Sequence, residues 1–228
     1  MTSFVRPLLI GVYEWLTHAD AVTRADLIFC LAGRQHRKKH ALALFLHELA
    51  PQVLLSVGRY EIRRLTDLAA PPHPDLVKLA AGIVPRERHF FLWFGFGTNR
   101  VDRITKKRLG TLSEICALKD WLTDHQEVKT VLMISCPVHL RRLRLCCRLL
   151  PASLQVRFIG SREPSLDGVR DWWCERQTRA MVFSELLKIL LYRVVLALPI
   201  TSHIMFRERR VRLDLTDAEA TSTSGMGA

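Results

Sequence analysis

Hydrophobic and polar positions along the chain fall into short blocks whose spacing predicts alternating strands and helices. Apolar runs of strand length lie at 25–31, 52–57, 89–95, 131–134 and 155–159. Apolar residues with helical spacing cover 4–18, 34–49, 111–125 and 171–196. Because strands and helices alternate, we predict an α/β fold, a Rossmann-like three-layer sandwich with about five mostly parallel strands and helices on both faces.

The length of 228 residues accommodates one large domain. We expect residues 1–24 to form an N-terminal helix and residues 25–212 to form a single Rossmann-like α/β domain. The composition becomes small and polar after residue 213, so 213–228 is predicted to be a disordered tail.

One junction carries more candidate chemistry than the others. The apolar run Val131–Ile134 ends abruptly at Ser135-Cys136-Pro137, and a basic amphipathic segment follows. This pattern is typical of a buried parallel strand, a tight turn and a helix. In an open α/β sheet, ligands bind at the carboxyl end of such strands.

The charge of the chain favours anionic partners. Lys and Arg number 34 against 22 Asp and Glu, which gives a net charge of +12. Phosphorylated small molecules, lipid headgroups and nucleic acid all fit this surplus. The basic clusters lack interleaved aromatic residues and nucleic-acid motifs, so a phosphorylated small molecule is the expected partner and nucleic acid is the weaker alternative.

Cysteine usage and hydropathy bear on localisation. The six cysteines form no CxxC pair, which favours reduced thiols in a cytoplasmic protein. The longest apolar segment, 189–206, contains Arg193, and a charge near the centre of a membrane span is costly. Peripheral membrane contact through 189–210 therefore stands as an alternative to a core-packing helix.

Loops that follow parallel strands meet at one edge of a sheet, so we expect residues distant in the chain to converge there. The expected ligand-binding residues are Gly33, Arg37, Gly58, Thr111, Ser135 and Arg142, and the expected catalytic residues are His139 and Glu114.

Each group has a chemical reason to take part. Helix N-termini offer backbone N–H groups to a phosphate, and Arg37 and Arg142 can each donate bidentate hydrogen bonds to its oxygens. His139 titrates near neutral pH and can donate a proton or a hydrogen bond. Glu114 can act as a base, or can orient His139 or Arg142.

Plainer explanations exist for several of these residues. Thr111 and Glu114 have the T-x-x-E spacing of a capping box, and Ser135 fits an N-cap. Cys136 and Arg142 have the C-x5-R spacing of cysteine phosphatases, a minor alternative because Pro137 removes one amide from the loop. The scattered histidines form no HxH or HExxH motif, so no metal site is predicted.

Five segments, which lie between residues 25 and 195, also carry a resemblance to a known family. They are ADLIFCLAG, QVLLSVGR, GTLSE at 110–114, ISCPVHLRRL at 134–143 and SELLKILLY at 184–192. Their order resembles the SanA/YdcF/ElyC-like proteins, a bacterial family with a Rossmann-like fold. The fourth segment is the most specific, since the family has Ser or Thr, a short gap and His-x-x-Arg, here Ser135, His139 and Arg142.

The resemblance implies a role in the cell envelope or in exopolysaccharide synthesis, linked to polyprenyl phosphate or cell-wall metabolism. It also associates the fold with nucleotide or S-adenosylmethionine binding. We therefore expect a phosphorylated or nucleotide-like ligand at the carboxyl edge of the sheet. If the protein is an enzyme, phosphoryl or glycosyl-phosphate chemistry fits the Arg and His residues. The alternative is a non-catalytic nucleotide-binding, S-adenosylmethionine-binding or partner-binding module.

Overall fold

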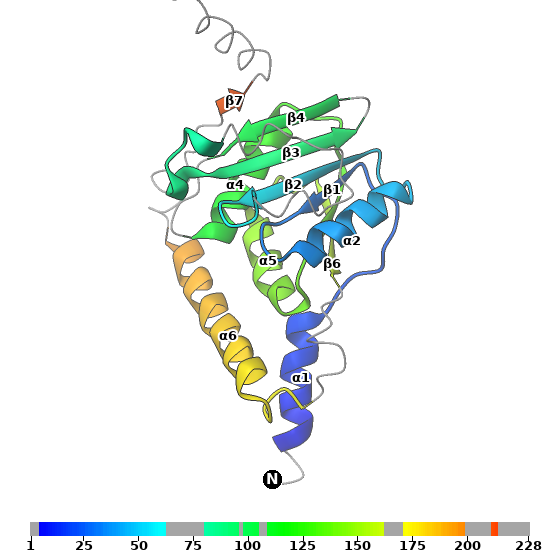
Figure 1. Ribbon diagram of the computed structural model, residues 1–228. Coiled ribbons are helices and arrows are strands. Elements are labelled where there is room, and N and C mark those ends of the chain that lie inside the picture. The colour runs from blue at the N-terminus through cyan, green and yellow to red at the C-terminus, as the bar shows by residue number, and fades with distance from the viewer. Residues whose placement is uncertain are drawn as a thin grey trace, which may run out of the picture.

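The computed structural model describes residues 5–62, 80–95, 98–104, 109–161, 171–198 and 211–213 (Figure 1). The strands are β1 (Leu27–Cys30), β2 (Gln52–Gly58), β3 (His89–Gly95), β4 (Thr98–Arg103), β5 (Thr130–Ser135), β6 (Gln155–Gly160) and β7 (Val211–Leu213). The helices are α1 (Val5–Thr17), α2 (Gln35–Leu46), α4 (Gly110–Thr123), α5 (Leu140–Cys146) and α6 (Arg176–Ala197), with short 3-10 turns η2 (Pro85–Glu87), η3 (Pro137–His139) and η4 (Cys147–Leu149).

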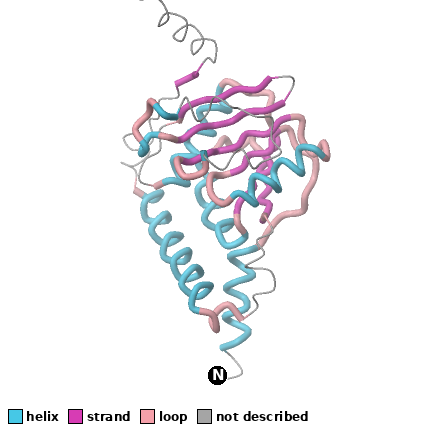
Figure 2. The backbone as a smooth tube through the Cα atoms, viewed as in Figure 1, coloured by secondary structure: helices cyan, strands magenta, loops and turns pink. Residues whose placement is uncertain are grey.

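The strands form one seven-stranded sheet in the order β6-β5-β1-β2-β3-β4-β7. Strands β6, β5, β1 and β2 are parallel, whereas β3, β4 and β7 continue the sheet in antiparallel pairings. The fold is therefore the predicted α/β, Rossmann-like sandwich, with β1 in the centre of its parallel part (Figure 2).

Each face of the sheet has its own hydrophobic core, because side chains alternate along a strand. Phe29 and Met133 point to the face that α4 and α5 cover, where Trp121 and Leu143 are buried. Ile28, Cys30 and Ile134 point to the other face, which α2 covers with Ala41 and Leu42. Figure 1 shows the helices on both faces, which gives the three layers.

Strand β3 runs opposite to the direction that the site prediction assumed. We expected the loop after the third strand to lie at the same edge as the loops after β1, β2 and β5. Because β3 is antiparallel to β2, the start of β3 lies at that edge instead, and His89 pairs with Gly58. The connector expected after residue 95 contains a further strand, β4, which forms a hairpin with β3.

Helices α1 and α6 extend away from the sheet, and the start of α6 lies near α1 at the bottom of the view (Figure 1). Trp172, which is buried, donates its indole Nε1–H to the Leu9 carbonyl at 2.8 Å and joins the two segments. The prediction placed Trp172 inside the long helix, but α6 begins only at Arg176. The predicted tail was 213–228, but Leu213 ends β7, and residues 214–228 lie outside the described residues.

Candidate functional site

A cavity of about 440 Å³ opens at the carboxyl edge of the parallel strands. Seven of the eight predicted site residues line it, namely Gly33, Arg37, Thr111, Glu114, Ser135, His139 and Arg142. They come from the loop after β1 and from α2, α4, β5, η3 and α5. The convergence that the parallel strand order predicts is therefore present in the structure.

A buried carboxylate organises one wall of this cavity. Glu185 on α6 has no solvent exposure, and three cationic or protonatable side chains surround it. Arg142 donates from Nε to Glu185 Oε2 at 2.8 Å, and Lys188 Nζ lies 2.8 Å from Oε1. The Nδ1 atom of His139 lies 3.1 Å from Oε2.

The ionisation of this group follows from its neighbours. Burial alone would raise the pKa of Glu185, but the hydrogen bonds and charges of His139 and Arg142 outweigh it and lower that pKa far below its usual range. Burial also lowers the pKa of His139, although Glu185 opposes this effect. Because the pKa of His139 is lowered, its imidazole is neutral at neutral pH, and we assign Nδ1–H as the donor to the ionised Glu185 carboxylate.

Arg142 does not hold its guanidinium ready for a phosphate, as the sequence suggested. Besides Glu185, it donates from Nη1 to the Thr111 hydroxyl, and its guanidinium lies over the Tyr192 ring at 5.5 Å. These contacts make Arg142 a positioning residue that ties α4, α5 and α6 together. Thr111 is the acceptor of this contact, not the N-cap of α4, which is Leu109. The capping-box explanation of Thr111 and Glu114 is therefore wrong.

Carboxylates also occupy the backbone N–H groups that were expected to bind phosphate. The Ala32 N–H donates to Glu114 Oε2 at 3.2 Å, and the Gly33 N–H donates to Glu61 Oε1. Glu61 further pairs with the buried Lys38. Burial raises the pKa of Glu61 although the charge of Lys38 opposes it. The turn after β1 is thus held by the chain itself, and its amides are not an empty phosphate cradle.

Arg37 is buried across the same turn rather than exposed to solvent. It donates from Nη1 to the Ala32 carbonyl at 2.9 Å and from Nε to Cys136 Sγ at 3.0 Å. Gly33 has φ +148°, and a Cβ there would come within 2.6 Å of Nη1 of Arg37. Glycine is favoured at this position because its positive φ is one that residues with a Cβ rarely adopt.

Cys136 does not line the cavity. Its thiol is buried beside Val138 and contacts Arg37, while the described contacts of Arg142 are with other groups. The described contacts give the phosphatase hypothesis no support. Ser135 is buried at the end of β5 and lines the cavity, and the N-cap of the following turn is Cys136 rather than Ser135.

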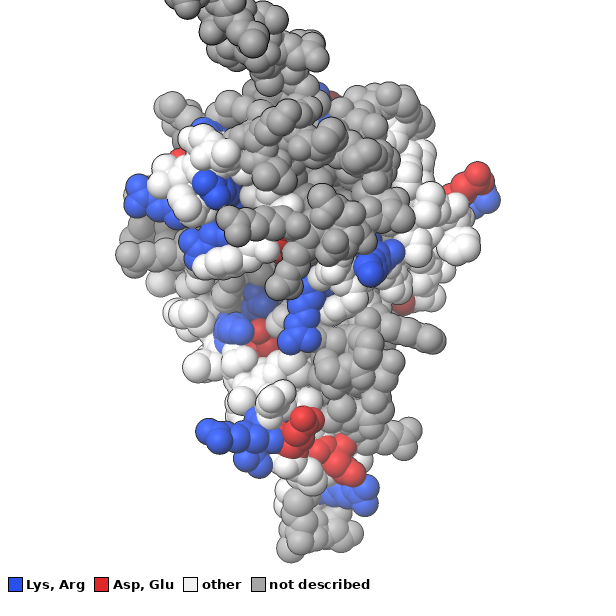
Figure 3. Space-filling model, in the orientation of Figure 1, with Lys and Arg blue, Asp and Glu red and all other residues white. Residues whose placement is uncertain are grey.

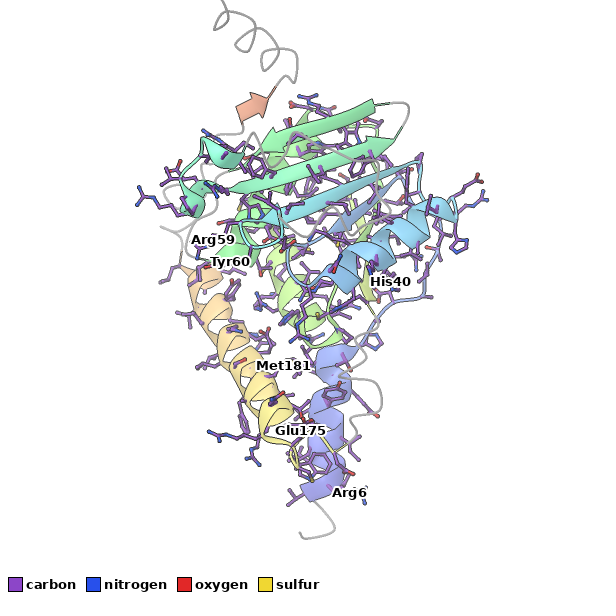
Figure 4. All side chains as sticks on the ribbon, in the orientation of Figure 1. Arg6, His40, Arg59, Tyr60, Glu175 and Met181 are labelled. Carbon is purple, nitrogen blue, oxygen red and sulfur yellow. The ribbon has the colours of Figure 1, made fainter. Side chains whose placement is uncertain are left out.

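Gly58, the eighth predicted residue, lines a second cavity of about 370 Å³. The two cavities share Ala32 and Gly33, so they adjoin at the turn after β1. Arg59 and Tyr60 also line the second cavity, and the Arg59 guanidinium lies over the ring of the exposed Tyr60 at 4.5 Å (Figure 4).

Several residues of this region were not predicted from the sequence, among them Glu61, Lys188, Glu185 and His89. Glu185 takes the orienting role that we considered for Glu114, whose described contacts are with Ala32 and His89. His89 is buried, bonds to the Ser56 hydroxyl at 2.8 Å and lies 3.8 Å from Glu114. A signal existed for Glu185, since it is the single acidic residue in the buried stripe of α6.

Comparison with protein-family models, with curated proteins and with solved structures gives no match to this chain. The resemblance to the SanA/YdcF/ElyC-like proteins therefore stays a prediction. Within the described part of the chain, no three His, Cys, Asp or Glu side chains lie close enough to hold a metal ion.

Proposed function

We propose that the chain binds a phosphorylated small molecule with free hydroxyl groups in the cavity at the carboxyl edge of the sheet, and that His139 acts there as a general base. One observation carries the proposal: a histidine that is held by a buried carboxylate lines a cavity whose charged side chains are mostly cationic. The ligand class follows from charge, and the reaction type follows from the histidine.

The cavity favours an anion. Four lining side chains are Arg or Lys, namely Arg34, Arg37, Arg142 and Lys188, and one, Glu114, is acidic. Glu185 behind the lining leaves a net surplus of two positive charges. In Figure 3, basic groups gather near the centre of the visible face with acidic groups beside them. Lys188 pairs with Glu185 but is 47% exposed, so its ammonium group can also donate to a phosphate oxygen.

The histidine provides the chemistry. Both described side-chain contacts of His139 involve Nδ1, which leaves Nε2 as the nitrogen that a ligand can reach. Nε2 would take a proton from a water molecule, and Glu185 would stabilise the resulting imidazolium. The water oxygen would attack the phosphorus of the bound ligand as the bond from phosphorus to the ligand's ester oxygen breaks. That oxygen would leave with the proton that His139 took up, so the products are the free alcohol and inorganic phosphate. Glu114, at the turn after β1, would accept a hydrogen bond from a ligand hydroxyl.

A non-catalytic binding module with the same cavity is the alternative. It would keep the cationic lining but would not need a neutral, oriented histidine. A role in the cell envelope or in exopolysaccharide synthesis, with a polyprenyl-phosphate-type ligand, rests on the resemblance alone.

Thermal unfolding with inorganic phosphate and with glucose 1-phosphate tests the ligand class. Ligand at about 100 times its Kd stabilises the native state by about 2.7 kcal/mol, so we expect a rise in Tm of several degrees. The double variant Arg34→Ala/Lys188→Ala should lose most of this rise, whereas Arg148→Ala, an exposed arginine outside the cavity, should keep it. No rise with either compound, or an equal rise in the double variant, overturns the proposal.

His139→Ala separates the enzyme from the binding module. If His139 is the base, phosphate release from a substrate that binds should fall by about 100-fold or more while the rise in Tm is kept. Equal release and equal binding in this variant would remove His139 from the mechanism.

A further inference from the structure

Helix α6 is apolar on its outer side as well as on its inner side. Thr178, Val182, Glu185, Ile189 and Tyr192 face the protein and are buried. The outer stripe consists of large apolar side chains that are about half exposed or more: Phe183 57%, Leu187 69%, Leu190 60%, Leu191 49%, Val194 53% and Leu198 53%. A helix with apolar side chains on two sides requires an apolar environment on each of them.

The extent of the outer stripe distinguishes it from ordinary surface hydrophobics. Single exposed apolar residues are common, but a contiguous row marks an interaction surface. The stripe runs from Phe183 to Leu198, about 22 Å at the rise of an α-helix. In Figure 1, α6 projects from the body along one side of the molecule, and that edge is largely white in Figure 3.

The charges beside the stripe select the partner. The exposed charged residues of α6 are all basic: Arg176, Arg179, Lys188 and Arg193. The acidic residue within α6, Glu185, is buried and paired. An apolar row with cationic flanks matches a surface that is apolar inside and anionic at its boundary, which describes a bilayer with acidic lipids.

Two other arrangements fit less well. Within the described residues, no helix has the length and hydropathy needed to cross a membrane. A second copy of the chain packed on α6 would bring like charges from the two helices together, with no exposed acidic residue on α6 to offset them.

We propose that the outer stripe of α6 docks on the surface of an anionic lipid bilayer. The stripe is continuous with the cavity, because Leu191 belongs to both and the flanking Lys188 also lines the cavity. Docking would therefore place the cavity opening beside the lipid headgroups. This inference does not depend on the proposed ligand or on His139.

Sedimentation of the full chain with vesicles tests it. We expect binding to phosphatidylcholine vesicles that contain about 30% phosphatidylglycerol, and little binding to pure phosphatidylcholine. The triple variant Leu187→Ser/Leu190→Ser/Val194→Ser changes exposed positions, so it should fold, and its affinity for the anionic vesicles should fall by about tenfold or more. The double variant Leu46→Ser/Tyr60→Ser is the matched control, because these exposed residues (70% and 78%) lie outside α6.

Two outcomes would overturn the proposal that the stripe docks on lipid. Vesicle binding that is equal in the triple variant would mean that another part of the chain contacts lipid. The other is a wild-type chain that does not bind anionic vesicles but forms a dimer, when the triple variant stays monomeric. That result would mean that the stripe binds a second copy of the chain. His139→Ala should bind vesicles as the wild type does, so failure of the proposed reaction would leave this result unchanged.

Discussion

Two carboxylate clusters lie at the same edge of the sheet, and they differ in what they hold. Glu185 holds side chains, namely Arg142, Lys188 and His139, which face the larger cavity. Glu61 and Glu114 hold the backbone of the turn after β1 through the N–H groups of Gly33 and Ala32. The first cluster prepares a base and keeps its cations in place. The second fixes the turn and occupies amides that a phosphate would otherwise use.

The difference between the two clusters indicates where an anion can bind. Glycine turns at the ends of parallel strands are often phosphate sites because their amides are unoccupied. In this chain the amides of Ala32 and Gly33 are occupied, so attraction for a phosphate must come from side chains on the opposite wall, chiefly Lys188. The following three predictions test this division of roles.

Removal of Glu185 should have the largest effect. Glu185→Ala leaves Arg142 buried without its carboxylate partner, and breaking such a pair costs about 3–5 kcal/mol. Urea unfolding measures the free energy of unfolding. Glu127→Ala, an exposed glutamate, should change it by less than about 0.5 kcal/mol. If the two variants are equally stable, Glu185 does not organise its cluster.

Removal of Glu114 should have a smaller effect. Glu114→Ala leaves the Ala32 N–H without its described acceptor, which costs about 1–3 kcal/mol for a buried group. Lys119→Ala, at an exposed position on the same helix, is the control for urea unfolding. A loss as large as that of Glu185→Ala would erase the distinction between the two clusters.

The smallest effect concerns pH. The pKa of His139 is lowered in the folded state, so the unfolded chain binds more protons as the pH falls below about 6.5. Stability should therefore decrease between about pH 7 and pH 5.5, and His139→Gln should flatten that slope. His47→Gln, at an exposed position, should leave it unchanged. Glu185 adds a further loss only below about pH 4.5, because its pKa is also lowered.

Much of the fold could be predicted because strand and helix periodicities are strong in this chain. The direction of β3 could not, since the run HFFLWFG has the same composition whichever way it pairs. Strand β4 was missed because TNRVDR is mostly polar, and its place depends on pairing with β3 and β7. Local pattern does not encode such partners.

The site followed the same division. The positions of His139 and Arg142 could be predicted, because both residues follow the end of β5 directly and that end lies at the carboxyl edge of the sheet. The carboxylate that pairs with them comes from α6, more than forty residues later. The role of Arg142 differs from the prediction for that reason. The sequence suggested that its guanidinium binds a ligand, but the guanidinium binds Glu185 and Thr111 of the protein itself.

Strand β7 has a practical consequence for any shortened form of the protein. It covers the outer side of β4 with three residues, Val211–Leu213. A chain that stops after residue 198 would leave the hydrogen-bonding groups of β4 open to strands from other molecules. Such uncovered edges promote self-association. Attempts to trim the C-terminal region for crystallisation should therefore keep residue 213.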